Sequence, residues 1–184
     1  MKLSVIALDY DGTIASNGRA DPDALASIVE AKSRGVVVIL VTGRILSDLE
    51  RVLPERELFD AIVAENGAVL AFPSGRTRAL ARGPSQALLD ELCRLEVACD
   101  FGDCIIDASA DLAPQILASI RKLELPLTIL FNRNRVMVLP QGISKATGLR
   151  ESLKTLRLSL HNCIGIGDAE NDHAMLDACE IGAA

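Results

Sequence analysis

The N-terminal third of the chain alternates short, continuous apolar runs with segments of helical period. A helix is predicted to begin at Pro22 with Asp21 as its N-cap and to end at Gly35. A second helix is predicted over residues 47–52. Three apolar runs predict strands that are buried on both faces of a parallel sheet: residues 3–8, 36–41 and 61–63. This β-α-β-α-β order is typical of an α/β protein with right-handed crossovers.

The pattern changes after residue 67. Helices are predicted after Pro84 and over residues 113–123, with a short apolar run at 104–106 between them. Two pairs of apolar runs, each pair separated by a polar turn, predict β-hairpins: 68–72 with 77–80, and 127–131 with 136–139. Hairpins that alternate with helices predict an inserted α+β domain over residues 68–140.

The first pattern returns near Gly142. The elements predicted there are a helix over 145–156, a strand over Cys163–Ile166, a helix over 171–178 and the start of a strand at Ile181. We therefore predict a discontinuous core domain, residues 1–67 and 141–184, with a Rossmann-like parallel sheet into which the α+β domain is inserted.

Composition and charge exclude several classes of function. Hydrophobic residues make up 49% of the 184 residues and aromatic residues only 3%, which predicts an aliphatic core and no stacking platform for single-stranded nucleic acid. The net charge of −6 argues against binding to a nucleic-acid backbone. Asp9 and Asp11 interrupt the N-terminal apolar run too early for a signal peptide, and no apolar run is long enough to span a bilayer. Five cysteines without a C-x-x-C pair predict buried, reduced thiols in a cytoplasmic protein.

Polar groups follow three of the predicted strands, at the edge of the sheet where ligands bind in open α/β folds. Asp9 and Asp11 follow the first strand, and Asp168 and Asp172 follow the strand near the C-terminus. Carboxylates gathered at one edge repel one another, and a divalent cation relieves this repulsion. Oxygen ligands without Cys or His favour Mg²⁺. A carboxylate beside Mg²⁺ stays ionised and can attack phosphorus to give an acyl phosphate.

The transferred phosphoryl group also needs positive charge and hydrogen-bond donors on its other oxygens. Thr42, which follows the second long strand, and Lys145, at the start of a helix, are placed to supply them. Each motif alone has an ordinary explanation, such as a capped loop, a turn or a surface lysine. Together, in this order and each after its own strand, they predict a site for phosphoryl chemistry.

These motifs resemble those of the haloacid dehalogenase (HAD) superfamily of aspartate-nucleophile phosphatases. The motifs are Asp9-Tyr10-Asp11-Gly12-Thr13, Val41-Thr42-Gly43-Arg44, Lys145 and Gly167-Asp168-Ala169-Glu170-Asn171-Asp172. The sequence Glu65-Asn66-Gly67 and the position of the inserted domain are similar to the type IIB, or Cof-like, branch. The small size of the insertion resembles the C2B caps of phosphoglycolate and sucrose-phosphate phosphatases.

The resemblance implies a role for each matching residue. Asp9 is the implied nucleophile, and Asp11 protonates the leaving alcohol and then activates water. The implied Mg²⁺ ligands are Asp9, the backbone carbonyl of Asp11, and Asp168, with Asp172 as a ligand or just outside it. The phosphoryl oxygens are bound by Thr42, Gly43, Lys145 and Asn171. The implied enzyme is a Mg²⁺-dependent phosphomonoesterase that acts on a sugar phosphate or a phosphorylated acid.

Several alternatives remain open at this stage. The same nucleophile could serve a phosphomutase or phosphotransferase, and the domain could be a non-catalytic sensor of a phosphorylated ligand within a larger protein. Members of the superfamily continue beyond the fourth motif, so the chain is expected either to be a fragment of a longer protein with further C-terminal domains or to complete its sheet as a homodimer. Five arginines near the two hairpins are candidates to bind an anionic substrate: Arg76, Arg78, Arg82, Arg133 and Arg135.

Overall fold

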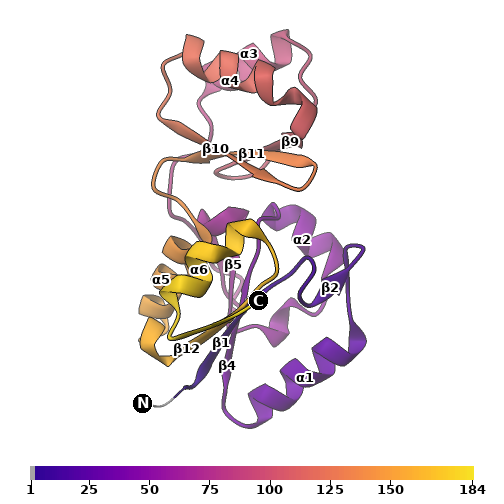
Figure 1. Ribbon diagram of the computed structural model, residues 1–184, viewed down its shortest axis with the longest axis vertical. Helices are drawn as coiled ribbons and strands as arrows, with labels where there is room; N and C mark the ends of the chain where they lie inside the picture. The colour runs from indigo at the N-terminus through magenta and orange to yellow at the C-terminus, as the bar shows by residue number, and fades with distance from the viewer. Residues whose placement is uncertain (1–2) are drawn as a thin grey trace.

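The computed structural model describes residues 3–184, in which two large β-sheets lie one above the other (Figure 1). A small third sheet is formed by β2 (Ala15–Ser16) and β3 (Arg19–Ala20). The lower, seven-stranded sheet has the order β13-β12-β1-β4-β5-β6-β7. The first five strands in this order run parallel, β6 pairs antiparallel with β5, and β7 pairs antiparallel with β6. Its strands are β1 (Val5–Asp9), β4 (Val37–Val41), β5 (Ala61–Ala64), β6 (Val69–Ala71), β7 (Thr77–Ala79), β12 (Cys163–Ile166) and β13 (Ile181–Ala183).

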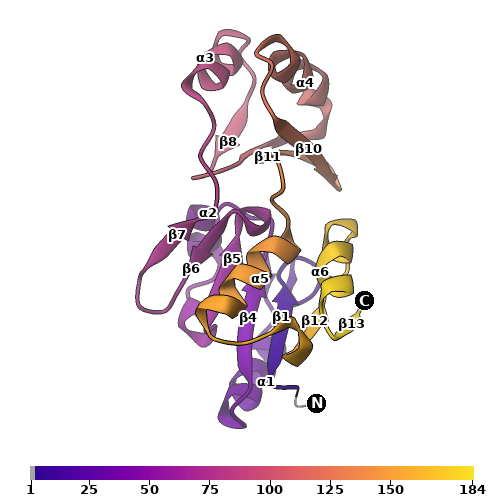
Figure 2. The same ribbon diagram turned by 90° about the vertical axis from the view of Figure 1, so that its left-hand side faces the viewer.

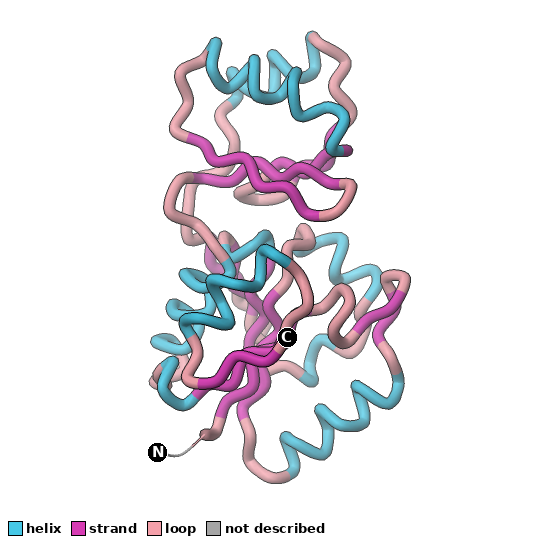
Figure 3. The backbone as a smooth tube through the Cα atoms, in the orientation of Figure 1, coloured by secondary structure: helices cyan, strands magenta, loops and turns pink. Residues whose placement is uncertain are grey.

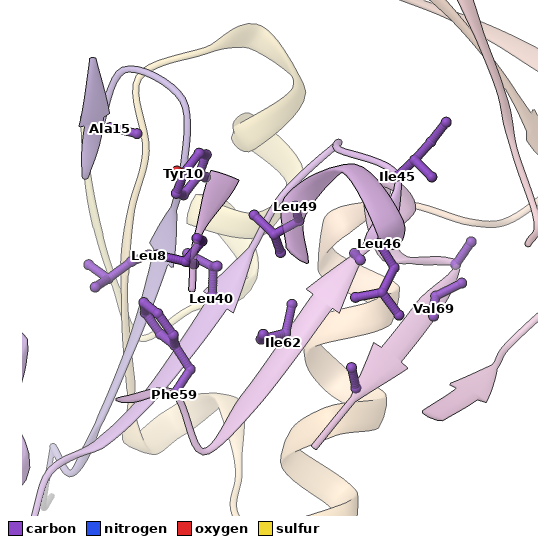
Figure 4. Close-up of a cluster of buried hydrophobic side chains, with 14 of the residues drawn as sticks. Leu8, Tyr10, Ala15, Leu40, Ile45, Leu46, Leu49, Phe59, Ile62 and Val69 are labelled. Carbon is purple, nitrogen blue, oxygen red and sulfur yellow. The ribbon is translucent and has the colours of Figure 1, made fainter. Parts of the chain in front are cut away.

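Helices cover both faces of this sheet. They are α1 (Pro22–Ser33), α2 (Leu46–Val52), α5 (Lys145–Thr155) and α6 (His173–Ala178). Helices α1 and α2 pack on one face, in a buried cluster that includes Ile28 of α1. Figure 4 shows Leu40 and Leu49 of the same cluster. Helices α5 and α6 pack on the other face, where Leu149 and Met175 are fully buried. Burial on both faces explains why the strands are continuous apolar runs.

The upper sheet is antiparallel, with the order β10-β11-β9-β8. Its strands are β8 (Cys99–Phe101), β9 (Ile106–Ser109), β10 (Leu127–Asn132) and β11 (Arg135–Pro140). Helices α3 (Gln86–Arg94) and α4 (Ala113–Lys122) cover its far face, and the other face is turned toward the core (Figures 2 and 3). The alternation along β11 separates Val136 and Val138, which pack under the helices, from Arg135 and Met137, which face the core.

The predicted α/β fold with a Rossmann-like core is confirmed, and Asp21 caps α1 as expected. The sheet order places one predicted element of the inserted domain in the core sheet instead. The hairpin expected to open the inserted domain, β6 and β7, instead extends the core sheet, because a tight turn brings β6 back against β5. We therefore propose that the inserted domain spans about residues 81–140. The pattern also missed β8, whose three residues are too short to show a period.

The turn between β5 and β6 is η2 (Glu65–Gly67), in which all three residues have positive φ. Gly67 is required there, because a Cβ atom would lie 2.0 Å from the backbone oxygen of Ser144 at the start of α5. The buried Glu65 carboxylate accepts hydrogen bonds from the backbone N–H groups of Asp103 (2.9 Å) and Cys104 (2.8 Å). Glu65 therefore ties the chain between β8 and β9 to the core.

All five cysteines are free thiols, as expected, but they are not all buried. Cys104 and Cys163 are buried, whereas Cys93 is exposed on α3 and the remaining two are half-buried. Cys93 lies on the solvent side of an amphipathic helix, which the sequence reading overlooked. Within residues 3–184, no helix combines the length and the apolar character that a membrane crossing requires.

Candidate active site

A buried ion-pair cluster lies at the carboxyl end of β1. Asp9 is the last residue of β1, Lys145 is the first residue of α5, and Asp172 ends the short helix η5 (Glu170–Asp172). The Lys145 Nζ lies 2.5 Å from Asp9 Oδ1 and 2.6 Å from Asp172 Oδ1, and all three side chains are at least 95% buried. One lysine thus holds two carboxylates that are far apart in the sequence.

Burial dominates the electrostatics of Asp9. It raises the pKa of the Asp9 carboxyl from 3.8 to about 6, against the opposing effect of the Lys145 ammonium, and the nearby Asp172 raises it further. An anion in this position is therefore costly unless positive charge stands beside it. The pKa remains below neutral pH, so Asp9 is an available carboxylate under ordinary conditions.

Asp168 joins this cluster from the loop after β12. One carboxylate oxygen from each of Asp9, Asp168 and Asp172 lies within 4.8 Å of the others, which is a spacing that a single cation can bridge. The Asp168 carboxylate packs directly on Gly12, where a Cβ atom would lie 2.3 Å from Asp168 Oδ2. Because Gly12 also has a φ of 99°, the Asp-Gly-Thr motif needs glycine for both its backbone and its space.

Both oxygens of Asp172 are engaged within the protein. Oδ1 accepts from Lys145, and Oδ2 accepts from the backbone N–H of Ala169 at 3.0 Å. Asp168, in contrast, is partly exposed, and its carboxylate pairs with Arg133 from the turn between β10 and β11, at 3.0 Å. This difference suits Asp168 as a direct ligand of a cation and Asp172 as the residue that orients Lys145 and the loop.

Asp11 is held by Arg44 rather than by the buried cluster. Its two carboxylate oxygens accept separate hydrogen bonds of 2.7 Å from Arg44 Nε and Nη2. Arg44 also donates to Asp48 at 2.9 Å and lies over the Tyr10 ring, 5.3 Å from its centroid. A bidentate pair fixed in this way gives the Asp11 carboxylate a defined orientation.

The residues predicted to bind phosphate lie around the same strand ends. Thr42 is buried, and its hydroxyl accepts from the Arg44 N–H at 3.1 Å. The Asn171 side-chain amide donates to Asn66 at 3.5 Å, whereas its Oδ1 is buried and has no hydrogen-bond partner among residues 3–184. Gly43 lies close to the upper sheet, because a Cβ atom there would be 2.9 Å from Met137 Cε.

A cavity of about 720 Å³ separates the core from the upper sheet and opens onto this cluster. Among the predicted site residues, Asp9, Asp11, Gly43, Lys145 and Asn171 line it. Thr42, Asp168 and Asp172 are not among the residues that line it. From the upper sheet, the lining residues include Arg133, Arg135, Asp107 and Met137.

Two of the five candidate arginines reach this cavity. Arg133 bridges to Asp168, and Arg135 donates to Asp107 (2.7 Å) and to Asp100 (2.7 Å) on the core-facing side of the upper sheet. Arg78 pairs instead with Glu151 on the outside of the core, and Arg76 lies over the Phe72 ring.

Sequence reasoning missed two of these features. Arg44 belongs to the Val-Thr-Gly-Arg motif, but the motif does not indicate that its guanidinium pairs with Asp11, 33 residues earlier. The pairing of Arg133 with Asp168 joins residues 35 positions apart, one in the turn between β10 and β11 and the other in the loop after β12. No local pattern contains that information.

Together, a buried aspartate, a buried lysine and a carboxylate cluster lie at the strand ends of a parallel sheet, which is the arrangement expected of an α/β enzyme of the phosphoryl-transfer class. A family model described as haloacid dehalogenase-like hydrolase matches residues 6–92 and 100–184. The chain belongs to this family, and the resemblance predicted from the motifs is confirmed.

Curated relatives along the full chain are phosphatases. The chain is 27% identical to a phosphoglycolate phosphatase of Methanoculleus marisnigri, and the alignment covers 99% of this chain and 83% of the relative. It is 23% identical to the 5-amino-6-(5-phospho-D-ribitylamino)uracil phosphatase YcsE of Bacillus subtilis, over 99% of this chain and 83% of the relative. The chain is thus a phosphoric monoester hydrolase of the family.

Solved structures confirm the fold. A haloacid dehalogenase-like hydrolase from Bacteroides thetaiotaomicron superposes with a TM-score of 0.79 at 17% identity, covering 97% of this chain and 86% of that one. A sugar phosphatase described as HAD subclass IIB superposes with a TM-score of 0.74 at 19% identity, covering 97% and 86% respectively.

Proposed function

We propose that this protein is a Mg²⁺-dependent phosphomonoesterase that works through a phosphorylated Asp9. The observation that carries the proposal is the buried Asp9–Lys145–Asp172 cluster, which opens onto a cavity large enough for a small phosphorylated metabolite. Fixed positive charge beside a buried carboxylate is the arrangement that transfer of a phosphoryl group needs.

The acidic cluster fits a hard divalent cation, because its donors are carboxylate oxygens within 4.8 Å of one another. Mg²⁺ would be held by Asp9, Asp168 and the backbone carbonyl of Asp11. Asp172 would be a further ligand or would lie next to the direct ligands. When bound, Mg²⁺ neutralises charge on the phosphoryl oxygens and on the carboxylates around them.

In the first step, the Asp9 carboxylate attacks phosphorus and the bond from phosphorus to the ester oxygen breaks. Lys145 supplies positive charge to the phosphoryl oxygens, and the Gly43 N–H, Thr42 and Asn171 donate hydrogen bonds to them. Asp11, in its protonated form, gives its proton to the leaving alcohol. The product of this step is an aspartyl phosphate on Asp9.

In the second step, Asp11 accepts a proton from water, which attacks the phosphorus of the aspartyl phosphate. Inorganic phosphate leaves and Asp9 is restored as a carboxylate. Because Asp11 acts in both steps on atoms that must be in line with phosphorus, its orientation matters, and Arg44 fixes the orientation of its carboxylate form through two hydrogen bonds.

Arg44 therefore provides a test of the role of Asp11. Arg44→Lys keeps the positive charge but loses the bidentate contact, and we expect it to lower kcat/KM for an alkyl phosphate about 10- to 100-fold. The loss should be much smaller for 4-nitrophenyl phosphate, whose leaving group needs no proton. Equal losses for both substrates would mean that Arg44 does not act through Asp11.

The upper sheet supplies the walls around the leaving group. Arg135 lines the cavity, and we expect Arg135→Ala to raise KM more than it lowers kcat, because it removes a contact outside the reacting centre. Steady-state kinetics on the substrate found by screening measure this effect. Arg76→Ala, on the outer hairpin, is the matched control. A wild-type KM in Arg135→Ala would place the leaving group elsewhere.

We propose that the substrate is a phosphorylated acid or a sugar phosphate. Relatives along the whole chain are named phosphoglycolate phosphatases, and a structural neighbour is described as a sugar phosphatase. A screen of phosphorylated metabolites with water as the acceptor tests the proposal. Phosphate release should require Mg²⁺ and stop with EDTA. Release at the same rate in EDTA would contradict it, and transfer to an added alcohol but not to water would indicate a phosphotransferase.

A further inference from the structure

Two cysteines meet at one edge of the core sheet, away from the active site. Cys163 is the first residue of β12, and Cys179 directly follows the end of α6. The chain returns beside β12 at this point, because the Glu180 N–H donates to the Cys163 carbonyl oxygen at 3.1 Å. Figure 2 shows α6, β12 and β13 packed together at this edge.

Both thiols lie on the same side of β12. Cys163 and Gly165 share a face of the strand because they are two residues apart. A Cβ atom at Gly165 would lie 3.0 Å from Cys179 Sγ and 3.5 Å from Cys179 Cβ, so the Cys179 side chain fills the space above Gly165. Both cysteines belong to the apolar cluster under α6, so their side chains pack in the same buried region.

The two thiols differ in exposure and acidity. Cys163 is fully buried, whereas Cys179 is half-buried and accessible to a small reagent. The interaction between the two thiols lowers the pKa of the Cys179 thiol and raises the pKa of the Cys163 thiol, which burial raises further. This asymmetry separates an attacking thiolate, Cys179, from a partner thiol, Cys163.

We propose that Cys163 and Cys179 form a redox-active pair that hydrogen peroxide converts to a disulfide. The Cys179 thiolate attacks one peroxide oxygen and the O–O bond breaks. Hydroxide departs as the leaving group, and Cys179 becomes a sulfenic acid. The Cys163 sulfur then attacks the Cys179 sulfur, and the S–O bond breaks. Hydroxide leaves and takes up the Cys163 proton as water. Two electrons pass from the sulfurs to the peroxide, which is reduced to water.

The disulfide would close a loop around the segment that carries Asp168 and Asp172. Both cysteines lie at the ends of β12 and α6 that are remote from these acids, since Asp168 follows β12 and Asp172 precedes α6. We therefore expect the oxidised protein to keep its phosphatase activity and to unfold at a higher temperature than the reduced protein. A crosslink constrains the unfolded chain more than the folded one.

Peptide mapping tests the proposal directly. The reduced protein is treated with hydrogen peroxide, remaining thiols are alkylated, and the protein is digested without a reductant for mass spectrometry. We expect a crosslinked peptide pair that contains Cys163 and Cys179 and has lost two hydrogen atoms. Recovery of both cysteines as separately alkylated peptides, under conditions that oxidise the exposed Cys93, would overturn the proposal.

Single variants separate the two roles. In Cys163→Ala, the sulfenic acid on Cys179 has no neighbouring thiol with which to form a disulfide. We therefore expect Cys179 to remain a sulfenic acid after peroxide treatment and to react with dimedone. Cys93→Ser removes an exposed cysteine on α3 and should form the same disulfide as the wild type. If Cys163→Ala does not fold, the wild-type peptide map still decides the matter. Failure of Cys179 to react with dimedone in a folded Cys163→Ala protein would contradict the assigned order of attack.

Discussion

Asp9→Asn is expected to lower kcat by a factor of at least about 10⁴, because the amide cannot attack phosphorus and removal of a nucleophile is among the largest single losses an enzyme can suffer. The fold should persist, since the substitution replaces one oxygen by an amide group and leaves Lys145 paired with Asp172. Initial rates with 4-nitrophenyl phosphate and Mg²⁺, together with a thermal unfolding curve, measure both expectations.

The control for this experiment is Asp23→Asn, which removes a carboxylate from the exposed first turn of α1. It should retain the wild-type rate. Hydrolysis by Asp9→Asn within a few fold of the wild-type rate, with or without metal, would show that Asp9 is not the nucleophile.

Lys145→Met is expected to lower the free energy of unfolding of the metal-free protein at neutral pH by about 3–5 kcal/mol, which is the usual cost of leaving a buried charge without its partner. Lys145 is the cation that separates Asp9 from Asp172, and all three side chains are buried. Its removal leaves two carboxylates facing each other in a site with little water. Activity should fall as well, because the phosphoryl oxygens lose their nearest positive charge.

Urea unfolding of both proteins in EDTA measures the stability change. Lys154→Met is the matched control, because Lys154 lies on the same helix and pairs with Glu151 in an exposed position. Its effect should be no more than about 1 kcal/mol. A Lys145→Met protein that is as stable as the wild type would mean that Lys145 does not balance the buried carboxylates.

The parts of the fold that depend on local chemistry could be predicted from the sequence. The continuous apolar runs identify β1, β4, β5 and β12 because these strands are buried on both faces. A parallel sheet places the polar residues that follow these strands at one edge. This rule alone predicts that Asp9, Asp168 and Asp172 come together, and the structure brings their carboxylates within 4.8 Å. Their roles in metal binding and catalysis stay predictions.

The parts that depend on tertiary pairing could not be predicted. The hairpin of β6 and β7 has the same local pattern whether it pairs with β5 or belongs to the inserted domain, and the turn at η2 decides the matter. The contacts of Arg133 with Asp168 and of Met137 with Gly43 depend on how the upper sheet sits over the core. Nothing in the order of residues along either segment specifies that placement.

The central claim is that Asp9 carries the phosphoryl group between the two steps. In Asp11→Asn, transfer from an activated aryl phosphate to Asp9 can still occur, but water is no longer activated, so the intermediate should accumulate. Acid quenching of this variant after one turnover, followed by peptide mass spectrometry, should find phosphate on the peptide that contains Asp9, and hydroxylamine should release it. One equivalent of 4-nitrophenol released with no phosphate on that peptide, or with phosphate on another residue, would contradict the account.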